Sequence, residues 1–532
     1  MEKNRFLLIP FMVGVALIVL SWWQSYPLEV TTLSGVIYDR ISMLYWIGLP
    51  ILLFSLFMLM VTLKNDSLKC LAAFVLVISM YSLPYFYYGS PGSDSHQFIG
   101  LTEYFIKTGN LNPTLPFHLY YEFPSFFILG KIAVDTSGIA LPGFEYILYT
   151  IMGFLMATAL YKYFSSSYKK GAFLAVSAFF IPMFYFLNYQ YAPFSLAFAL
   201  LLVSIMLDTT RVEARGKMVA SLVLFAGMSL THTFVPLFFL LYALVMYILS
   251  RKTEHLRLFL LTAIIYFLVQ ISEASLTFQA NIQTLLHAGS EYASLAEQVL
   301  TPASASIDRI AQTISRPLVI ATVAVAGLSF VYVLARKRGL LSRPLDKSVF
   351  ISGVLYSILG AFVQLLGSRA IPLAFIPVLF GVAYLYESKL KIPLIAFFSI
   401  SLVLFISLPI HGSFYDSQTM YQTQEAYQAE NFMVNAFNWT HGGFILAHTR
   451  VVTYLAARQP SSATYESDYS RLFPRFQDYD SILYTIGLGK NMLMYNTTIE
   501  NLLQQGHVNL VYNNGFSLMT IKSSNLTWTP NQ

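Results

Sequence analysis

The amino-acid sequence predicts a polytopic α-helical membrane protein that carries a small α/β domain at its C-terminal end. Three observations predict this fold class. Hydrophobic residues make up 56% of the 532 residues and charged residues only 11%, whereas an ordinary soluble protein has about 25% charged residues. Apolar stretches long enough to cross a hydrocarbon layer of about 30 Å recur between residues 6 and 409. Beyond residue 409 they stop and strand-like segments follow.

The apolar stretches predict about thirteen membrane spans. The first follows Lys3 and Arg5, and because no small-residue cleavage site comes after it, we expect an uncleaved helix and not a signal peptide. Hydropathy alone leaves open whether residues 217–250 form one span or two. The expected spans are 6–23, 43–63, 68–88, 143–164, 171–188, 191–208, 217–231, 234–250, 256–272, 317–335, 348–366, 369–387 and 391–409.

The positive charges predict the orientation of these spans. The net charge is +6, and the Lys and Arg residues gather in short loops, where they mark the cytoplasmic side of a membrane protein. With a cytoplasmic N-terminus and thirteen spans, every cation-rich short loop is cytoplasmic. A single helix over 217–250 would place the basic run 336–338 outside, so a break near residues 231–233 is favoured. This pattern argues against a nucleic-acid-binding protein.

The odd number of spans predicts which segments lie outside the cytoplasm. They are the loops 89–142 and 273–316 and the region 410–532. In that last region, segments 444–447, 507–512 and 516–521 alternate as strands do, with a turn signal at 513–515 between the last two. A helix is expected around 418–437. Because Cys70 is the only cysteine, no intramolecular disulfide can stabilise this domain.

The loop 89–142 contains the residues with the strongest chemical signal. In the run 92–96 (GSDSH), Asp94 and His96 stand immediately before an amphipathic helical pattern. An Asp at this position often does no more than cap the helix. The alternative is that Asp94 is a carboxylate at the membrane interface that accepts a proton from a hydroxyl group. His96 would then orient that carboxylate or contact a phosphate.

Other polar residues follow in the same loop. Glu103 falls on the polar face of the expected helix, and His118, Tyr121 and Glu122 precede an apolar stretch, 123–134, that is too short to span a bilayer. We expect that stretch to form a short interfacial or re-entrant helix. A connecting loop of this length with helices of its own is longer than a connection requires. Glu103, His118, Tyr121 and Glu122 are therefore candidates for contact with the molecule whose hydroxyl group Asp94 would deprotonate.

These features resemble the GT-C superfamily of membrane glycosyltransferases. The resemblance rests on the long outer loop with its acidic residue and on three short motifs, 92–96 (GSDSH), 230–236 (LTHTFVP) and 368–372 (SRAIP). It is strongest to prokaryotic, especially archaeal, members. The superfamily includes protein O-mannosyltransferases, aminoarabinose transferases of lipid A and oligosaccharyltransferase catalytic subunits. The run 22–26 (WWQSY) lacks the Asp of the oligosaccharyltransferase motif, which favours transfer of single sugars.

The resemblance implies an inverting glycosyltransferase with a polyprenyl (dolichyl) phosphate sugar as donor and a glycan, glycolipid or protein as acceptor. It implies that Asp94 is the catalytic base. Basic residues would hold the donor phosphate, and the expected topology offers Arg369, His232 and either Arg316 or Arg309 on the outer side. For His232, capping of a helix break is the other interpretation. No cofactor is required by the resemblance, and the sequence leaves a divalent metal open.

Two functions other than glycosyl transfer are also compatible with the sequence. A transporter or lipid flippase would place ionisable residues near the middle of its spans, whereas here the span centres carry almost no charge and the candidates gather at one interface. A non-catalytic assembly factor for cell-surface glycans, acting through its C-terminal domain, is the second alternative.

Overall fold

The computed structural model describes most of the helical region and five strands of the C-terminal region. At some helix positions only the backbone is described. The described residues are 2–26, 41–63, 65–80, 86, 93–111, 118–139, 141–169, 171–186, 191–277, 279, 308–336, 341, 343–362, 364–386, 391–407, 443–446, 463–466, 481–486, 508–513 and 517–522.

Each of the thirteen predicted apolar segments coincides with a helix. The region 217–250 is divided into two helices, as the distribution of charge favours. The helix expected at 317–335 begins earlier, at Asp308, so Arg309 and Arg316 belong to it. The helices are α1 Glu2–Ser25, α3 Met43–Thr62, α4 Asp66–Met80, α7 Leu141–Ser165, α8 Ala172–Phe186, α9 Pro193–Leu207, α10 Ala214–Ser229, α11 Val235–Ser250, α12 Thr253–Ser272, α14 Asp308–Arg336, α15 Pro344–Phe362, α16 Gln364–Leu385 and α17 Lys391–Ser407.

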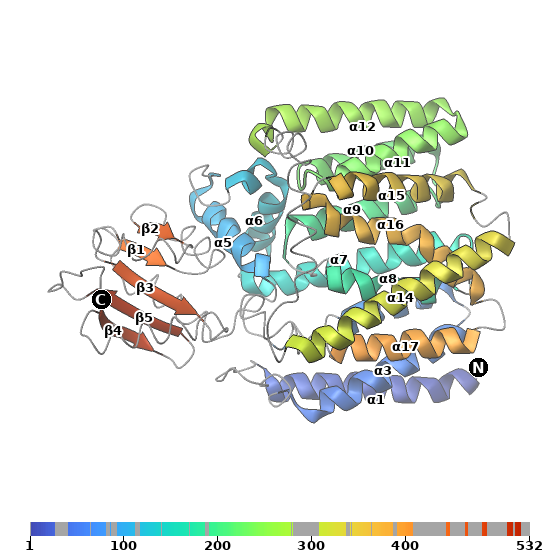
Figure 1. Ribbon diagram of the computed structural model, residues 1–532, viewed down its shortest axis with the longest axis horizontal. Helices are drawn as coiled ribbons and strands as arrows, with labels where there is room; N and C mark the ends of the chain where they lie inside the picture. Colours follow the sequence, from blue (N-terminus) through green and yellow to red (C-terminus); the bar gives the residue numbers. More distant parts are fainter. Residues whose placement is uncertain are drawn as a thin grey trace.

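Three further elements come from the loop between α4 and α7. They are α5 (Ser93–Thr108), the 3₁₀ helix η2 (His118–Glu122) and α6 (Ser125–Ser137). Both helices expected in this loop, the amphipathic one after Asp94 and the short apolar one, are therefore present. Figure 1 shows them together at one end of the helical body, which we call the α5 end, while the N-terminus of α1 lies at the opposite end.

The surface of the helical body is apolar in a way that fits a lipid environment. Phe6 on α1 is 76% exposed and Ile271 on α12 is 68% exposed, and from residue 258 onward the other exposed large side chains of α12 are also apolar. A soluble protein rarely exposes so large an apolar area. Among the described residues, four stretches are long and apolar enough to cross a bilayer by themselves: Phe6–Ser25, Met43–Met60, Phe144–Ser165 and Thr253–Ser272.

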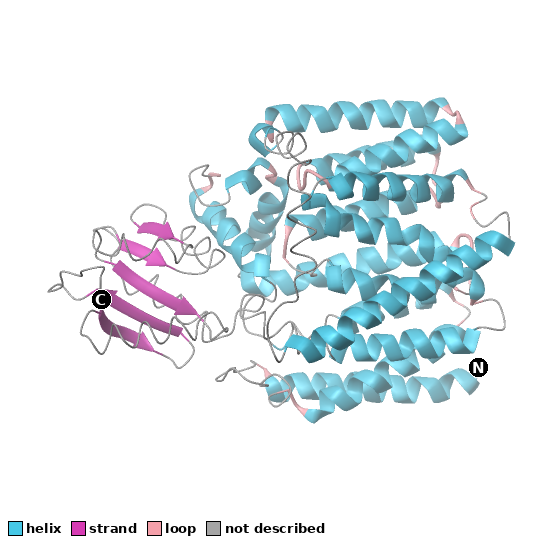
Figure 2. Cartoon of the chain, in the orientation of Figure 1, coloured by secondary structure: helices cyan, strands magenta, loops and turns pink. Residues whose placement is uncertain are grey.

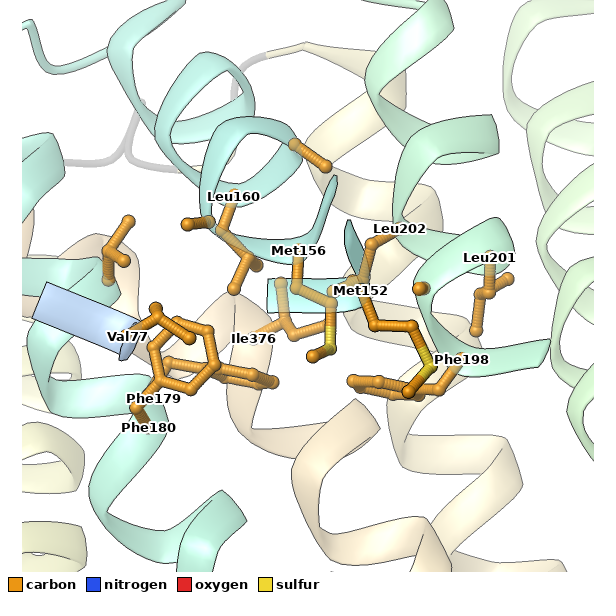
Figure 3. Close-up of a cluster of buried hydrophobic side chains, with 14 of the residues drawn as sticks. Val77, Met152, Met156, Leu160, Phe179, Phe180, Phe198, Leu201, Leu202 and Ile376 are labelled. Carbon is orange, nitrogen blue, oxygen red and sulfur yellow. The ribbon is translucent and has the colours of Figure 1, made fainter. Parts of the chain in front are cut away.

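The middle of the body is packed with apolar side chains. Met152 and Met156 of α7 lie against Phe179 of α8 and Phe198 of α9 (Figure 3), and all four are fully buried. The rings of Phe179 and Phe198 are parallel with their centres 6.2 Å apart. Unbranched methionine side chains fill the irregular spaces between such rings.

The C-terminal strands form one mixed sheet (Figure 2). Its strands are β1 Gly443–Leu446, β2 Ala463–Glu466, β3 Ser481–Ile486, β4 Val508–Asn513 and β5 Ser517–Lys522. The order is β2-β1-β3-β5-β4; β1 is parallel to both β2 and β3, and β5 is antiparallel to both β3 and β4.

The antiparallel pair β4–β5 confirms the pairing expected across the turn signal at 513–515. The helix expected at 418–437 lies outside the described residues. In Figure 1 the sheet lies beyond α5 and α6, at the same end of the helical body.

Candidate functional site

The predicted site residues fall on elements at or near the α5 end. Asp94 and His96 are in the first turn of α5, and His118 begins η2. Arg309 and Arg316 lie in the first third of α14, and Arg369 is the sixth residue of α16. The structure describes only the backbone of these six residues. A carboxylate in the first turn of a helix, such as that of Asp94, is favoured by the helix dipole.

In the described part of the chain, two contacts on one face of α5 hold this helix against the helical body. Ser95 is fully buried, and its Oγ accepts a hydrogen bond of 2.8 Å from the backbone N–H of Tyr191. Two turns further along, the Oγ1 of Thr102 lies 3.2 Å from the Oη of Tyr191. Because Ser95 lies between Asp94 and His96, the first of these bonds fixes the backbone that carries both candidates.

A second tyrosine holds α5 from the side of η2. Tyr121 is buried, and its hydroxyl donates a hydrogen bond of 3.1 Å to the carbonyl oxygen of Leu101. Burial raises the pKa of Tyr121 far above its ordinary value, and Tyr104 raises it further. A raised pKa keeps the hydroxyl protonated, so Tyr121 remains a donor to α5 throughout the physiological pH range.

Glu122 connects the loop between α4 and α7 to the segment that follows α12. Its Oε1 accepts a hydrogen bond of 3.1 Å from the N–H of Leu276, and its Oε2 accepts one of 2.8 Å from the N–H of Thr277. Bonds from backbone N–H groups to an ionised carboxylate are roughly twice as strong as neutral ones. Both carboxylate oxygens of Glu122 therefore hold the backbone of the segment after α12. Contact between Glu122 and an acceptor remains a prediction.

His232 lies in the break between α10 and α11 and is 7% exposed. Its Nδ1 accepts a hydrogen bond of 3.1 Å from the N–H of Phe234. Since the nitrogen that accepts this bond carries no proton, the neutral ring has its proton on Nε2. The ring also packs edge-to-face against Phe194 at 5.3 Å. The bond to Phe234 supports the capping interpretation, and it leaves His232 a neutral Nε2–H donor instead of a cation.

The break is joined to three neighbouring helices. The hydroxyl of Tyr266 on α12 donates to the carbonyl of Thr233, and that of Tyr356 on α15 donates to the carbonyl of Phe234. The N–H of Ser125, where α6 begins, donates to the carbonyl of Leu230 at 3.1 Å. These bonds place the break with His232 beside the loop that carries Asp94.

Buried charges in the described helices are confined to helix ends. Lys69 is the fourth residue of α4, Glu145 the fifth of α7 and Asp346 the third of α15. Asp346 makes a bidentate ion pair with Nε and Nη2 of Arg343, and Nη1 of Arg343 donates to the Oγ of Ser166. Because these charges lie away from the middle of the body, the apolar centre that the sequence predicts is confirmed for the described helices.

Sequence reasoning missed the residues that hold the loop between α4 and α7 in place. They are Ser95, Thr102 and Tyr191, together with Ser125 and Leu230. The available signal was small: a short polar run, 188–190, between two apolar segments, followed by Tyr191 and then a proline at 193 that is typical of a helix start. The contacts join segments 96 residues apart, and no local pattern reports such a pairing.

Comparison with solved structures identifies the fold. The structure of ArnT from Cupriavidus metallidurans in the apo state matches with a TM-score of 0.50 and 11% identity, over 86% of this chain and 98% of ArnT. The structure of the same protein bound to undecaprenyl phosphate matches with a TM-score of 0.52 and 11% identity, over 87% of this chain and 98% of ArnT.

Sequence comparison adds nothing to this likeness. No protein-family model matches the chain, and no curated protein matches it significantly. ArnT is a GT-C glycosyltransferase, so the fold that the resemblance implied is confirmed. The chain is a multi-pass membrane protein with the GT-C fold.

Proposed function

We propose that the protein is a glycosyltransferase that moves a sugar from a polyprenyl phosphate to an acceptor outside the cytoplasm. The observation that carries this proposal is the fold. The chain matches 98% of the length of ArnT, and one of the ArnT structures holds undecaprenyl phosphate. A lipid-linked phosphate is thus a ligand that this arrangement of helices accommodates. Whether the isoprenoid is undecaprenyl or dolichyl is part of the test.

The proposal includes a membrane topology. All thirteen helices that match the predicted segments cross the bilayer, the N-terminus is cytoplasmic, and the α5 end is the outer face. Residues 1–409 then form the membrane domain with outer loops 89–142 and 273–316, and residues 410–532 form an extracytoplasmic domain. The position of the sheet beyond α5 and α6 supports this arrangement (Figure 1).

In the proposed reaction, Asp94 is the base and His96 orients it. The carboxylate of Asp94 takes the proton from the acceptor hydroxyl as the hydroxyl oxygen attacks the anomeric carbon. The bond from that carbon to the phosphate oxygen breaks, and the electron pair leaves with the polyprenyl phosphate, so the configuration inverts. A positioned base of this kind contributes about 10²–10⁴-fold to the rate.

The leaving phosphate needs positive charge and hydrogen-bond donors. We assign the charge to Arg369 and to Arg316 or Arg309, because a guanidinium binds phosphate with two parallel hydrogen bonds. His232 serves as a neutral donor through Nε2, as its bond to Phe234 indicates. The helix that carries Arg369 begins near the break, since Tyr356 in the C-terminal half of α15 bonds to Phe234 and α16 follows α15 directly.

The acceptor is proposed to bind along α5 and η2. Tyr121 and Glu122 bond to the backbone of neighbouring segments, so their part is to shape this wall. Glu103 and His118 are the candidates for direct contact with the acceptor. By the resemblance the reaction needs no cofactor, and an assay with and without a chelator decides whether a divalent metal takes part.

The test is a transfer assay in detergent. Purified protein is given a series of polyprenyl-phosphate sugars that differ in sugar and isoprenoid, with glycan, glycolipid and peptide acceptors, and products are identified by mass spectrometry. Detergent removes the two compartments that a transporter or flippase needs. Transfer of a sugar from at least one donor supports the proposal. No transfer, together with movement of a labelled lipid across reconstituted vesicles, would establish the transporter alternative.

A further inference from the structure

Among the described residues, Tyr191 contacts α5 at Ser95 and at Thr102, which are two helical turns apart. Its backbone N–H donates to Ser95, and its side-chain hydroxyl meets Thr102. Ser95, Thr102 and Tyr191 are all fully buried. No water competes for these bonds, so a partner left without its bond is costly in free energy.

The direction of the bond between the two hydroxyls follows from a third contact. The Oγ1 of Thr102 donates its proton to the carbonyl oxygen of Phe98 at 2.7 Å. A threonine hydroxyl has a single proton to donate. The hydroxyl of Tyr191 must therefore be the donor to Thr102, and Tyr191 is the donor in its bonds to both Ser95 and Thr102.

Helix α6 confines the Tyr191 side chain from the other side. The rings of Tyr191 and Phe126 lie with centres 4.6 Å apart. At Gly130, an added Cβ would come within 2.7 Å of both the Oη of Tyr191 and the Cγ2 of Thr102. The absence of a side chain at Gly130 therefore lets α6 close over the bond between Tyr191 and Thr102.

We propose that Tyr191 is a positioning residue that sets the place of α5, and with it the backbone of Asp94 and His96, relative to the helical body. This inference rests on the proposed function of Asp94. Proximity effects make a transfer reaction sensitive to displacements of about 1 Å, which can cost about 10²-fold in rate. Loss of the Tyr191 hydroxyl is therefore expected to lower kcat and to leave the KM for the donor nearly unchanged.

The test compares Tyr191→Phe with Tyr242→Phe. Tyr242 is also fully buried, and its hydroxyl donates to Asp208, which is on the C-terminal side of α9, at the opposite end from Tyr191. Both variants lose one buried hydroxyl, but only Tyr191→Phe touches α5. We expect Tyr191→Phe to lower kcat by about tenfold or more with less than a threefold change in KM, while Tyr242→Phe keeps the wild-type kcat even if its melting temperature falls.

Two further measurements separate this inference from the proposed function. Amide hydrogen exchange in residues 93–108 should be faster in Tyr191→Phe than in wild type and unchanged in Tyr242→Phe. Thr102→Val should lower kcat as Tyr191→Phe does, and the double variant should be no slower than either single one. Unchanged exchange in α5, an unchanged kcat or additive effects would overturn the inference. Absence of transfer by wild-type protein would instead refute the proposed function, and the exchange data would still test the position of α5.

Discussion

The hydrogen bond of His232 shows how one contact in the structure refines an interpretation made from the sequence. From the sequence, two roles were open for this residue: capping a helix break or binding a phosphate. The structure shows that Nδ1 accepts the N–H of Phe234, so one nitrogen is engaged in the break and the other retains its proton. Both roles are thus compatible in one ring. This tautomer depends on the backbone geometry of residues 230–234, which no residue pattern reports.

Two substitutions separate the roles of His232. His232→Asn keeps an oxygen that can accept the N–H of Phe234, because short amide side chains bond to the backbone two residues on. It should retain the stability of wild type and raise the KM for the lipid donor several-fold. His232→Ala should also lose about 1–3 kcal/mol of stability, since the Phe234 N–H is left without an acceptor. Donor titrations and thermal unfolding in detergent measure the two effects. An unchanged KM in His232→Asn would leave capping as the only role.

At the scale of elements, local patterns predicted nearly every helix. Apolar stretches fix the position of a membrane helix because a backbone in hydrocarbon must satisfy its own hydrogen bonds. The amphipathic pattern after Asp94 likewise predicted α5. The early start of α14 was missed because residues 308–316 are mostly polar and extend the helix beyond its apolar part. The sequence also did not predict which helices pack against each other, because helix packing depends on contacts between residues far apart in the chain.

One crossing, between α14 and α16, can be tested with a matched pair of glycines. A Cβ on Gly381 of α16 would lie 2.3 Å from the backbone nitrogen of Phe330 on α14. At Gly327, also on α14, an added Cβ meets nothing within 4 Å. Gly381→Ala should cost about 1–3 kcal/mol of stability through overpacking, and Gly327→Ala should be neutral or stabilising by up to about 1 kcal/mol. Equal melting temperatures for the two variants would contradict this crossing.

At the scale of the whole molecule, the proposed function depends on which segments lie at the same end of the helical body. Charge in the loops predicted that the loop with Asp94 and the C-terminal region lie together, and the structure has α5, α6 and the sheet at one end of the body (Figure 1). The order of strands in the sheet was not predictable, because β1 lies between β2 and β3, and β5 lies between β3 and β4. Only the β4–β5 pair has a short turn that makes it a local feature.

The topology can be tested by cysteine labelling in intact cells. Cys70 is the only cysteine of the chain, so its replacement gives a background without reactive thiols. Single cysteines introduced at positions 94 and 450 should both react with a membrane-impermeant reagent, whereas one at Arg215, in a predicted cytoplasmic loop, should react only after the cells are permeabilised. Labelling of positions 94 and 450 on opposite sides would contradict the thirteen-span topology.

The central claim is that Asp94 is the base of a sugar transfer at the outer face. The measurement that tests it most directly is the rate of transfer from a polyprenyl-phosphate sugar by wild type, Asp94→Asn and Asp135→Asn. Asp135 is an exposed carboxylate on α6 that pairs with Lys131, so its substitution removes the same charge from the same loop. We predict that Asp94→Asn lowers kcat by about 10²-fold or more and that Asp135→Asn keeps the wild-type rate. Transfer by Asp94→Asn at the wild-type rate would contradict the mechanism.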